Sequence, residues 1–227
     1  MKHFCYLIFC CFFLSSCCEM IEEIYLTKKG NGKAKITIDA KESAPLIAFF
    51  MTQAGQSIMP DMPPIPSVTE LEQKSKILVE TLNKADNGIS NANFSWDFKS
   101  AKFIFQADFT SISAWNKALQ NLEFEGMQLQ NFVHYTFSSD NQVFTRRVTP
   151  EAAQQFKNRQ KNPNATEAQF LSAFQNARYQ FALEYEKPIR GEASNNLYLK
   201  ADQKISMQIR FGELFEAPDK INLSVKL

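Results

Sequence analysis

The cysteines are the residues in this chain whose type and position point most directly to covalent chemistry. All five lie within the first 18 residues, and Cys17 follows an unbroken apolar run, Phe4 to Leu14, and two small serines. A cysteine thiolate is a far better nucleophile than a hydroxyl group, so a thiol at this position can be alkylated. The apolar run is shorter than the roughly 20 residues that a membrane-spanning helix needs. It follows Lys2 closely, which is typical of the hydrophobic part of a secretory signal.

The four residues Leu14-Ser15-Ser16-Cys17 resemble the bacterial lipoprotein lipobox, in which a branched apolar residue and two small residues precede a cysteine. The resemblance implies that Cys17 receives a diacylglycerol, that cleavage falls after Ser16, and that the new amino terminus can be acylated. Two or three acyl chains would anchor the protein stably, at about 0.8 kcal/mol per buried CH₂ group. A plain signal peptide with an incidental cysteine is the alternative.

A very short connection separates Cys17 from the first expected strand, which begins at Ile21. Four residues reach only about 13–14 Å when extended, so a domain anchored at Cys17 would sit against the bilayer. Glu19, Glu22 and Glu23 make this region acidic, and we expect anionic headgroups to repel them. The expected division is residues 1–16 as a lipoprotein signal peptide, 17–20 as the lipidated N-terminus and tether, and 21–227 as a single domain.

The composition of the chain argues against several classes of protein. Its 25 basic and 24 acidic side chains give a formal net charge of +1, whereas a nucleic-acid-binding protein would show a basic stripe. Because no cysteine follows Cys18, the rest of the chain can form no disulfide and offers no thiol nucleophile. His134 is the only histidine outside the signal, and one histidine cannot form an ordinary zinc site. We therefore expect no metal site and no cofactor.

Short runs of alternating apolar and polar residues recur along the chain and predict β-strands joined by tight turns. Gly30-Asn31-Gly32, for example, suits the positive φ angles of a hairpin turn. Segments with helical spacing lie between the hairpins, and Ser67 followed by Glu70 predicts a capping box. A hairpin followed by a helix, three times, and then a closing set of strands predicts an α+β fold, an antiparallel sheet with helices packed on one face. The expected strands are residues 21–26, 33–39, 94–98, 103–109, 133–137, 143–148, 179–185, 197–199, 205–211 and 221–227, and the expected helices are 43–54, 67–84, 112–122 and 150–174, the last broken at Pro163.

One of these hairpins carries aromatic residues at alternate positions on both of its strands. Such rings form a core face in one interpretation, and in the other they line an apolar cavity. We therefore treat them as candidate ligand-binding residues. The candidates are Phe94, Trp96, Phe98, Phe103 and Phe105.

Residues 56–66 form a loop rich in proline and methionine, where four prolines forbid a helix or a central strand. It is either a stiff connector packed on the surface, or a contact for a partner, a ligand or the membrane.

Paired carboxylates are the remaining residues that could catalyse a reaction, since glycosidases need only two. Glu184 and Glu186 share a strand face near Arg190, and Asp97 and Asp108 lie on the polar faces of another hairpin. Charges on a solvated sheet face are ordinary, and so is the pair Arg146-Arg147, whose side chains point to opposite faces of a strand. We expect no catalytic residue, and a protein that is not an enzyme.

Both ends of the chain are similar to a group of small Bacteroidota-type lipoproteins. The similarity covers the acidic start, the Gly30-Asn31-Gly32 hairpin, the strand Ile36-Thr37-Ile38-Asp39, and the ending from Tyr185-Glu186-Lys187-Pro188-Ile189 to Leu214-Phe215 and the strand entry at Pro218. The architecture of the group distantly resembles the LppM-type lipoprotein domain, for which lipid binding has been suggested. The resemblance carries over one site residue, Cys17, as the point of lipid attachment.

These observations predict a lipid-anchored, non-enzymatic protein of the bacterial cell envelope, in the outer membrane. Its first expected partner is the membrane, through acyl chains on Cys17, and we expect no nucleic acid. In one hypothesis the domain also binds a lipid or another apolar ligand between its sheet and helices. In the other, its core is solid and it is a structural or interaction protein that meets an envelope partner through its surface.

Overall fold

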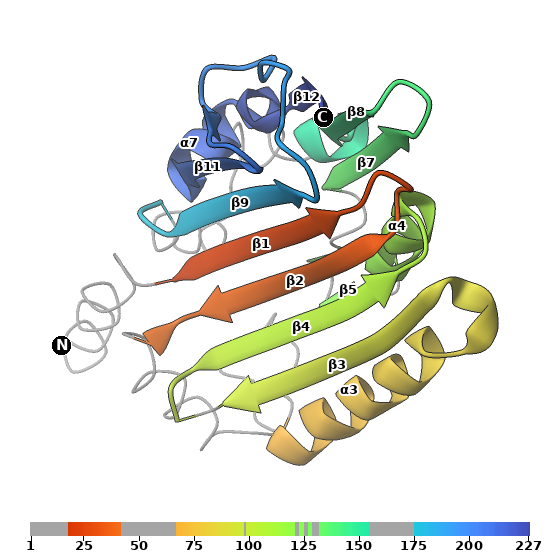
Figure 1. Ribbon diagram of the computed structural model, residues 1–227. Helices are drawn as coiled ribbons and strands as arrows, with labels where there is room; N and C mark the ends of the chain where they lie inside the picture. The colour runs from red at the N-terminus through yellow and green to blue at the C-terminus, as the bar shows by residue number, and fades with distance from the viewer. Residues whose placement is uncertain are drawn as a thin grey trace, which may run out of the picture.

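The computed structural model describes residues 18–41, 67–97, 99–120, 123–124, 127–128, 132–154 and 175–227. Cys17, the expected helix at 43–54, the loop at 56–66, the side chain of Phe98 and the second half of the expected helix at 150–174 lie outside these ranges. The described strands form one large sheet, one three-stranded sheet and a small two-stranded ribbon (Figure 1).

The large sheet has seven strands in the order β10-β11-β9-β1-β2-β4-β3. Neighbouring strands are antiparallel except β1 and β9, which run parallel with Glu19 opposite Arg178. The first and last parts of the chain therefore meet in the middle of the sheet. Its strands are β1 (Glu19–Leu26), β2 (Gly32–Asp39), β3 (Ile89–Asp97), β4 (Lys102–Phe109), β9 (Arg178–Tyr185), β10 (Leu199–Lys200) and β11 (Lys204–Arg210).

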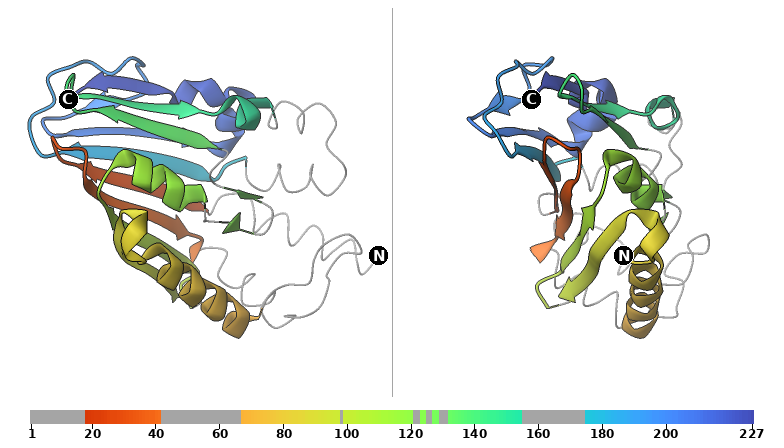
Figure 2. Two further views of the ribbon diagram at one scale, coloured as in Figure 1. Left: turned by 90° about the vertical axis from the view of Figure 1, so that its right-hand side faces the viewer. Right: turned by 45° about the vertical axis from the view of Figure 1, so that its right-hand side comes forward.

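The smaller sheet has the antiparallel order β12-β8-β7, and β5 pairs with β6 in a separate ribbon. The small sheet lies on the same side of the large sheet as helix α4 (Ile112–Gln120) and helix α3 (Val68–Leu82), as Figure 2 shows. These strands are β5 (Glu123–Phe124), β6 (Met127–Gln128), β7 (Val133–Ser138), β8 (Val143–Val148) and β12 (Leu223–Lys226).

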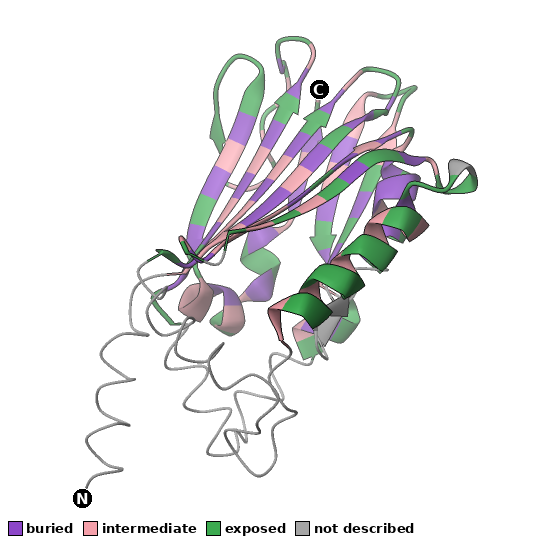
Figure 3. Cartoon of the chain, turned by 90° about the horizontal axis from the view of Figure 1, so that it is seen from below, coloured by how far each residue is buried: buried purple, intermediate pink, exposed green. Residues whose placement is uncertain are grey.

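The helix starts follow the local capping chemistry. Ser67 Oγ accepts the backbone N–H of Glu70, and Glu70 Oε2 accepts the N–H of Ser67 at 2.6 Å, so the predicted capping box is confirmed. Ser111 Oγ caps α4 by accepting the N–H of Ala114. In Figure 3, the side of α3 that faces away from the sheet is exposed, as expected for an amphipathic surface helix.

The core lies between the large sheet and the elements that cover its inner face. Every second residue of β9, of β11 and of β1 from Glu22 onward is buried, so these strands follow the predicted alternation. The α+β class is confirmed. The division of the strands into two sheets and the parallel pair β1–β9 were not anticipated, because strand alternation does not specify which strands pair.

The prediction that Phe211 extends a strand is wrong, because this residue begins helix α7 (Phe211–Glu216). The rings of Phe211 and Phe215 lie 5.9 Å apart, and residues four positions apart meet on one face of a helix. Leu214 and Phe215, expected near a strand entry, therefore belong to this helix, and the final strand begins at Leu223.

Two asparagines cover strand backbone with their side-chain amides. Asn116 on α4 donates to the carbonyl of Tyr135 at 2.7 Å and accepts its N–H at 3.1 Å, on the outer side of β7. Asn83, just after α3, makes the same pair of bonds with Ala92 of β3 at 3.1 and 2.9 Å. β7 and β3 are each the last strand of their sheet, so both amides satisfy edge groups that could otherwise pair with another chain.

Candidate functional site

The described chain enters the large sheet directly after the predicted lipidation site. The carbonyl of Cys18 accepts the backbone N–H of Arg178 at 2.9 Å, and β1 begins at the next residue, Glu19. The strand starts two residues earlier than the sequence pattern suggested, which shortens the expected tether further. Cys17 itself lies outside the described residues.

Between the two sheets lies a buried cluster of polar side chains. Glu22 on β1 is 5% exposed and Arg146 on β8 is 0% exposed, and their charged groups lie 3.5 Å apart. Arg146 also donates to the carbonyl of Ile221 at 2.8 Å and to the hydroxyl of Tyr179, while the hydroxyls of Tyr135 and Tyr179 donate to Glu22. This Glu22–Arg146 cluster joins the large sheet to the small one.

Two sequence interpretations are therefore wrong. Glu22 does not contribute to an acidic, headgroup-facing surface, because its side chain points into the core and meets Arg146. Arg146 is not an ordinary surface residue, although its neighbour Arg147 is exposed on the other face of β8. Strand alternation does put Glu22 on the same face as Ile24 and Leu26, which was the available signal for its burial.

The electrostatics of the cluster suit a structural role. The guanidinium carbon of Arg146 lies 4.6 Å from the ring centre of Phe181 and 5.3 Å from that of Tyr179, which are favourable distances for a cation over an aromatic face. Burial, together with the nearby charge of Glu22, raises the pKa of Tyr135 and of Tyr179 well above the usual value. Both phenols therefore remain protonated hydrogen-bond donors at neutral pH.

Four of the five aromatic candidates share one face of the β3–β4 hairpin, with Phe94 opposite Phe105 and Trp96 opposite Phe103, while Phe98 lies outside the described residues. The ring centres of Trp96 and Phe103 lie 4.5 Å apart, and those of Phe94 and Trp96 lie 4.7 Å apart. Phe105 is a core residue, 3% exposed and stacked on Trp115. Phe94, Trp96 and Phe103 are only partly buried.

Helix α3 contacts this aromatic face at a defined point. The indole N–H of Trp96 donates to Ser75 Oγ at 2.7 Å, and Ser75 in turn donates to the carbonyl of Leu71. The Trp96 ring is therefore fixed in orientation between the sheet and the helix.

Asp97 and Asp108 are not brought together by the fold. Asp97 lies opposite Lys102 at one end of the β3–β4 hairpin, and Asp108 lies opposite Ser90 near the other end. Hydrogen bonds from Ser100 lower the pKa of Asp97. Glu186 accepts the backbone N–H of Lys28 at 3.0 Å, a contact that fixes a turn.

His134 is exposed on β7, between the buried residues Val133 and Tyr135. Among the residues that the structure describes, no group of three or more potential metal ligands occurs. In the same residues, no helix is both long and apolar enough to cross a bilayer.

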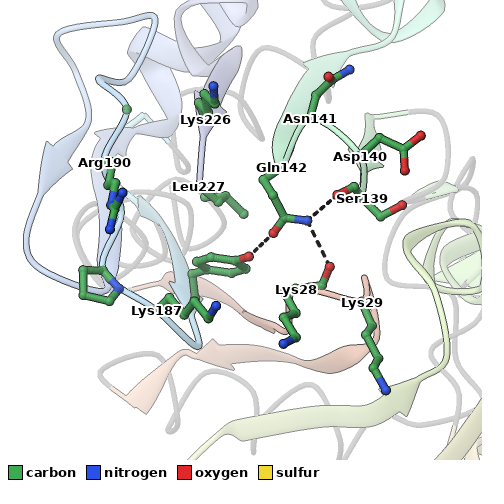
Figure 4. A pocket seen from close by; sticks show the side chains of 13 residues that line it. Lys28, Lys29, Ser139, Asp140, Asn141, Gln142, Lys187, Arg190, Lys226 and Leu227 are labelled. Atoms are coloured by element: carbon green, nitrogen blue, oxygen red, sulfur yellow. Dashed lines mark hydrogen bonds between the residues drawn. The ribbon is translucent and has the colours of Figure 1, made fainter.

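A pocket of about 1090 Å³, lined mainly by charged and polar residues, lies beyond the end of β1 that is far from Cys18. Figure 4 shows its lining side chains. It is formed by the β1–β2 turn, the β7–β8 turn, the segment after β9 and the end of β12. Sequence reasoning missed it because each of these segments is an ordinary polar turn by itself. The residues that line it are Lys28, Lys29, Ser139, Asp140, Asn141, Gln142, Tyr185, Lys187, Pro188, Arg190, Gly191, Lys226 and Leu227.

Gln142, in the β7–β8 turn, is hydrogen-bonded to its own turn and to the three other parts of the pocket. Its side-chain N–H groups donate to the carbonyls of Lys28, at 3.1 Å, and of Ser139, and its side-chain oxygen accepts the hydroxyl of Tyr185. Its backbone carbonyl accepts the N–H of Leu227 at 2.7 Å. The pocket is therefore built from segments that are fixed to one another.

The fold and these sites define a two-sheet α+β domain with a buried ion pair between the sheets. No family model matches the sequence, and no curated protein is similar to it. Among solved structures, the NMR structure of the folded domain of the Mycobacterium tuberculosis LppM protein matches with a TM-score of 0.42 and 8% identity, over 93% of this chain and 89% of that one. At this level the likeness identifies neither a family nor a function.

Proposed function

We propose that the protein is a lipid-anchored, non-enzymatic protein of the bacterial envelope, whose domain is held directly at the membrane by acyl chains on Cys17. The observation that carries the proposal is the hydrogen bond from Arg178 to the carbonyl of Cys18. It leaves one peptide unit, about 3.8 Å, between the anchored residue and the sheet. An anchor at this point would fix the height of the domain above the bilayer, and the outer membrane is the site that we propose.

The packing of the described core favours a protein that binds a partner at its surface over one that holds a lipid in a cavity between the two sheets. That space holds Arg146, Tyr135 and Tyr179, each no more than 2% exposed, together with Glu22. Filling it with a lipid would separate a buried ion pair from its hydrogen-bond partners, which is costly. We therefore propose an envelope interaction protein with a solid core as the principal function.

An apolar ligand remains a second candidate at one place, the aromatic face under α3. Phe94, Trp96 and Phe103 are partly exposed there although their rings contact one another. Partly exposed aromatic rings that are held in fixed orientations are suitable walls for an apolar ligand.

The anchor is tested by the mass of the mature chain. The full chain is produced in a bacterial host that processes lipoproteins, and the membrane fraction is analysed by intact mass spectrometry. We expect loss of residues 1–16 and addition of a diacylglycerol group with further acylation. Cys17→Ala should leave an uncleaved precursor without lipid, whereas the matched control Cys18→Ala should be processed normally. Normal processing of Cys17→Ala would refute the anchor.

A further inference from the structure

The pocket around Gln142 has an unbalanced charge. Its lining includes five basic side chains and a single acidic one, Asp140, although the chain as a whole is close to neutral. None of the five forms an ion pair with a carboxylate in the described part of the chain, whereas Lys33, Lys35 and Lys102 on the outer face of the large sheet all do. The basic side chains are Lys28, Lys29, Lys187, Arg190 and Lys226.

The nearest additional carboxylate does not cancel this charge by direct pairing. Glu186 precedes Lys187, but its Oε1 atom accepts the backbone N–H of Lys28 at 3.0 Å rather than a lysine ammonium group. Asp140 lies in the β7–β8 turn, on the upper side of the pocket in Figure 4. The other side chains that line the pocket carry amide, hydroxyl or apolar groups.

The backbone around the pocket is constrained at two positions, by an unusual φ angle at Gln142 and by close packing at Gly191. Gln142 has a φ angle of 52°, in the left-handed region that is uncommon for residues other than glycine. A side chain at Gly191 would place its Cβ atom 2.5 Å from the carbonyl oxygen of Lys226, so only glycine fits there. A left-handed backbone at a residue other than glycine, as at Gln142, persists where the surroundings over-determine it, and such positions concentrate at functional sites.

We propose that this pocket binds a small organic anion that carries two or more negative charges, either a phosphate ester or a polycarboxylate. Its volume of about 1090 Å³ is slightly above the range of about 300–1,000 Å³ that is usual for small-molecule sites, and it exceeds what a single inorganic ion would fill. Four of the five cations are lysines, whose ammonium groups act as mobile point charges rather than as a rigid fork. We therefore expect binding to depend more on how many negative charges the ligand carries than on the exact arrangement of its charged groups.

The source of the anion follows from the position of the pocket. β1 runs from Glu19 to Leu26 and leads directly into Lys28 and Lys29, so the pocket lies about 25 Å along the strand from Cys18. If the anchor at Cys17 holds, which is the one step that depends on the proposed function, the pocket lies at the far end of β1 from the anchored residue. We therefore expect its ligand to come from the aqueous phase and not from the headgroups of that membrane.

The test uses the purified full chain in a non-ionic detergent at low salt, with pyrophosphate and citrate as probes. Binding is measured by isothermal titration calorimetry and by the NMR amide signals of Lys28, Gln142 and Lys226. We expect saturable binding of at least one probe, with shifts centred on these amides and an affinity that falls as NaCl is added. The NMR readout uses the unaltered chain and does not depend on the folding of a variant.

Two double variants that lose the same charge distinguish binding in the pocket from a general effect of the net charge of the protein. Lys28→Gln with Lys187→Gln should weaken binding by about tenfold or more, since two unit charges near the ligand are lost. Lys76→Gln with Lys204→Gln removes the same charge from exposed positions outside the pocket and should change the affinity by less than about twofold.

Each outcome decides the proposal. Binding of pyrophosphate alone shows a preference for phosphate groups and favours a phosphate ester as the ligand, binding of citrate alone favours a polycarboxylate, and binding of both supports recognition by charge number. No saturable binding of either probe, equal weakening in both double variants, or binding only to vesicles of phosphatidylglycerol would overturn the proposal. The anchor is unaffected by any of these results, because it is tested by processing at Cys17.

Discussion

The guanidinium group of Arg146 and the carboxylate of Glu22 lie 3.5 Å apart, although one belongs to the small sheet and the other to the large sheet. Both side chains are almost completely excluded from solvent, at 0% and 6% exposure. Removing one member of such a pair leaves an uncompensated buried charge, whereas replacing both by apolar groups can be nearly neutral.

Glu22→Gln should therefore destabilise the protein by about 3 kcal/mol or more, measured by urea unfolding followed by tryptophan fluorescence. The double variant with Arg146→Met should recover a large part of this loss, because no buried charge remains. The exposed ion pair Lys35–Glu23 provides the control, and Glu23→Gln should change stability by less than about 1 kcal/mol. A Glu22→Gln variant as stable as this control would show that the buried pair does not hold the sheets together.

The buried phenols predict a loss of stability in alkali. The pKa values of Tyr135 and Tyr179 are raised in the folded protein above the usual value of 10.0, mainly by burial. The folded state therefore holds these two protons more strongly than the unfolded state. The stability that the protonated phenols contribute is fully present below pH 10, and it is lost as the pH rises above 10 toward their raised pKa values. We expect the free energy of unfolding to fall above pH 10, and Tyr179→Phe should make that fall less steep. A pH dependence unchanged in Tyr179→Phe and in Tyr135→Phe would contradict this account.

The side-chain amide of Asn116 should contribute measurably to stability, because it is hydrogen-bonded to the backbone of an edge strand. Asn116→Ala leaves the N–H and the carbonyl of Tyr135 without their partners, which is expected to cost about 1–3 kcal/mol. It also uncovers an edge strand, so light scattering during heating should show earlier aggregation. Asn93→Ala, an exposed asparagine on β3, is the matched control and should be neutral. Equal behaviour of the two variants would exclude a role for Asn116 in protecting the edge.

Trp96 tests the second candidate function. If an apolar ligand lies against the aromatic face, native mass spectrometry with lipid extraction should find it on the purified chain, and Trp96→Lys should remove it while the protein is still exported. Ser75→Ala breaks the hydrogen bond that orients the indole and should weaken ligand retention only partly. A ligand retained fully by folded Trp96→Lys would place the binding site elsewhere. If the purified chain carries no ligand, the result would favour the principal proposal, an interaction protein that binds its partner at the surface.

Local patterns in the sequence were sufficient to predict most individual elements. Alternation located β7, β8 and β9, and the pair Ser67 and Glu70 located the start of α3, because these signals depend only on residues close in the chain. The shared face of Phe94 and Phe105 followed from the same alternation.

Features that depend on distant segments could not be predicted in this way. The contact between Glu22 and Arg146 requires two sheets to face each other, and a charge on an apolar strand face does not identify its partner. The pocket around Gln142 requires turns from four parts of the chain to meet. Each of its lysines is indistinguishable in sequence from a solvated surface residue.

If the protein is exported as proposed, the parallel pairing of β1 with β9 determines which strands can pair while the chain is still arriving in the envelope. A chain that crosses a membrane from its N-terminus delivers β1 with only one sheet neighbour, β2, because Arg178 and the rest of β9 follow most of the chain. Until they arrive, one side of β1 is an open strand edge, and its contacts with β9 have a high contact order that slows closure. The incomplete domain would thus spend its earliest time in the envelope able to pair with a chaperone or with another copy of itself.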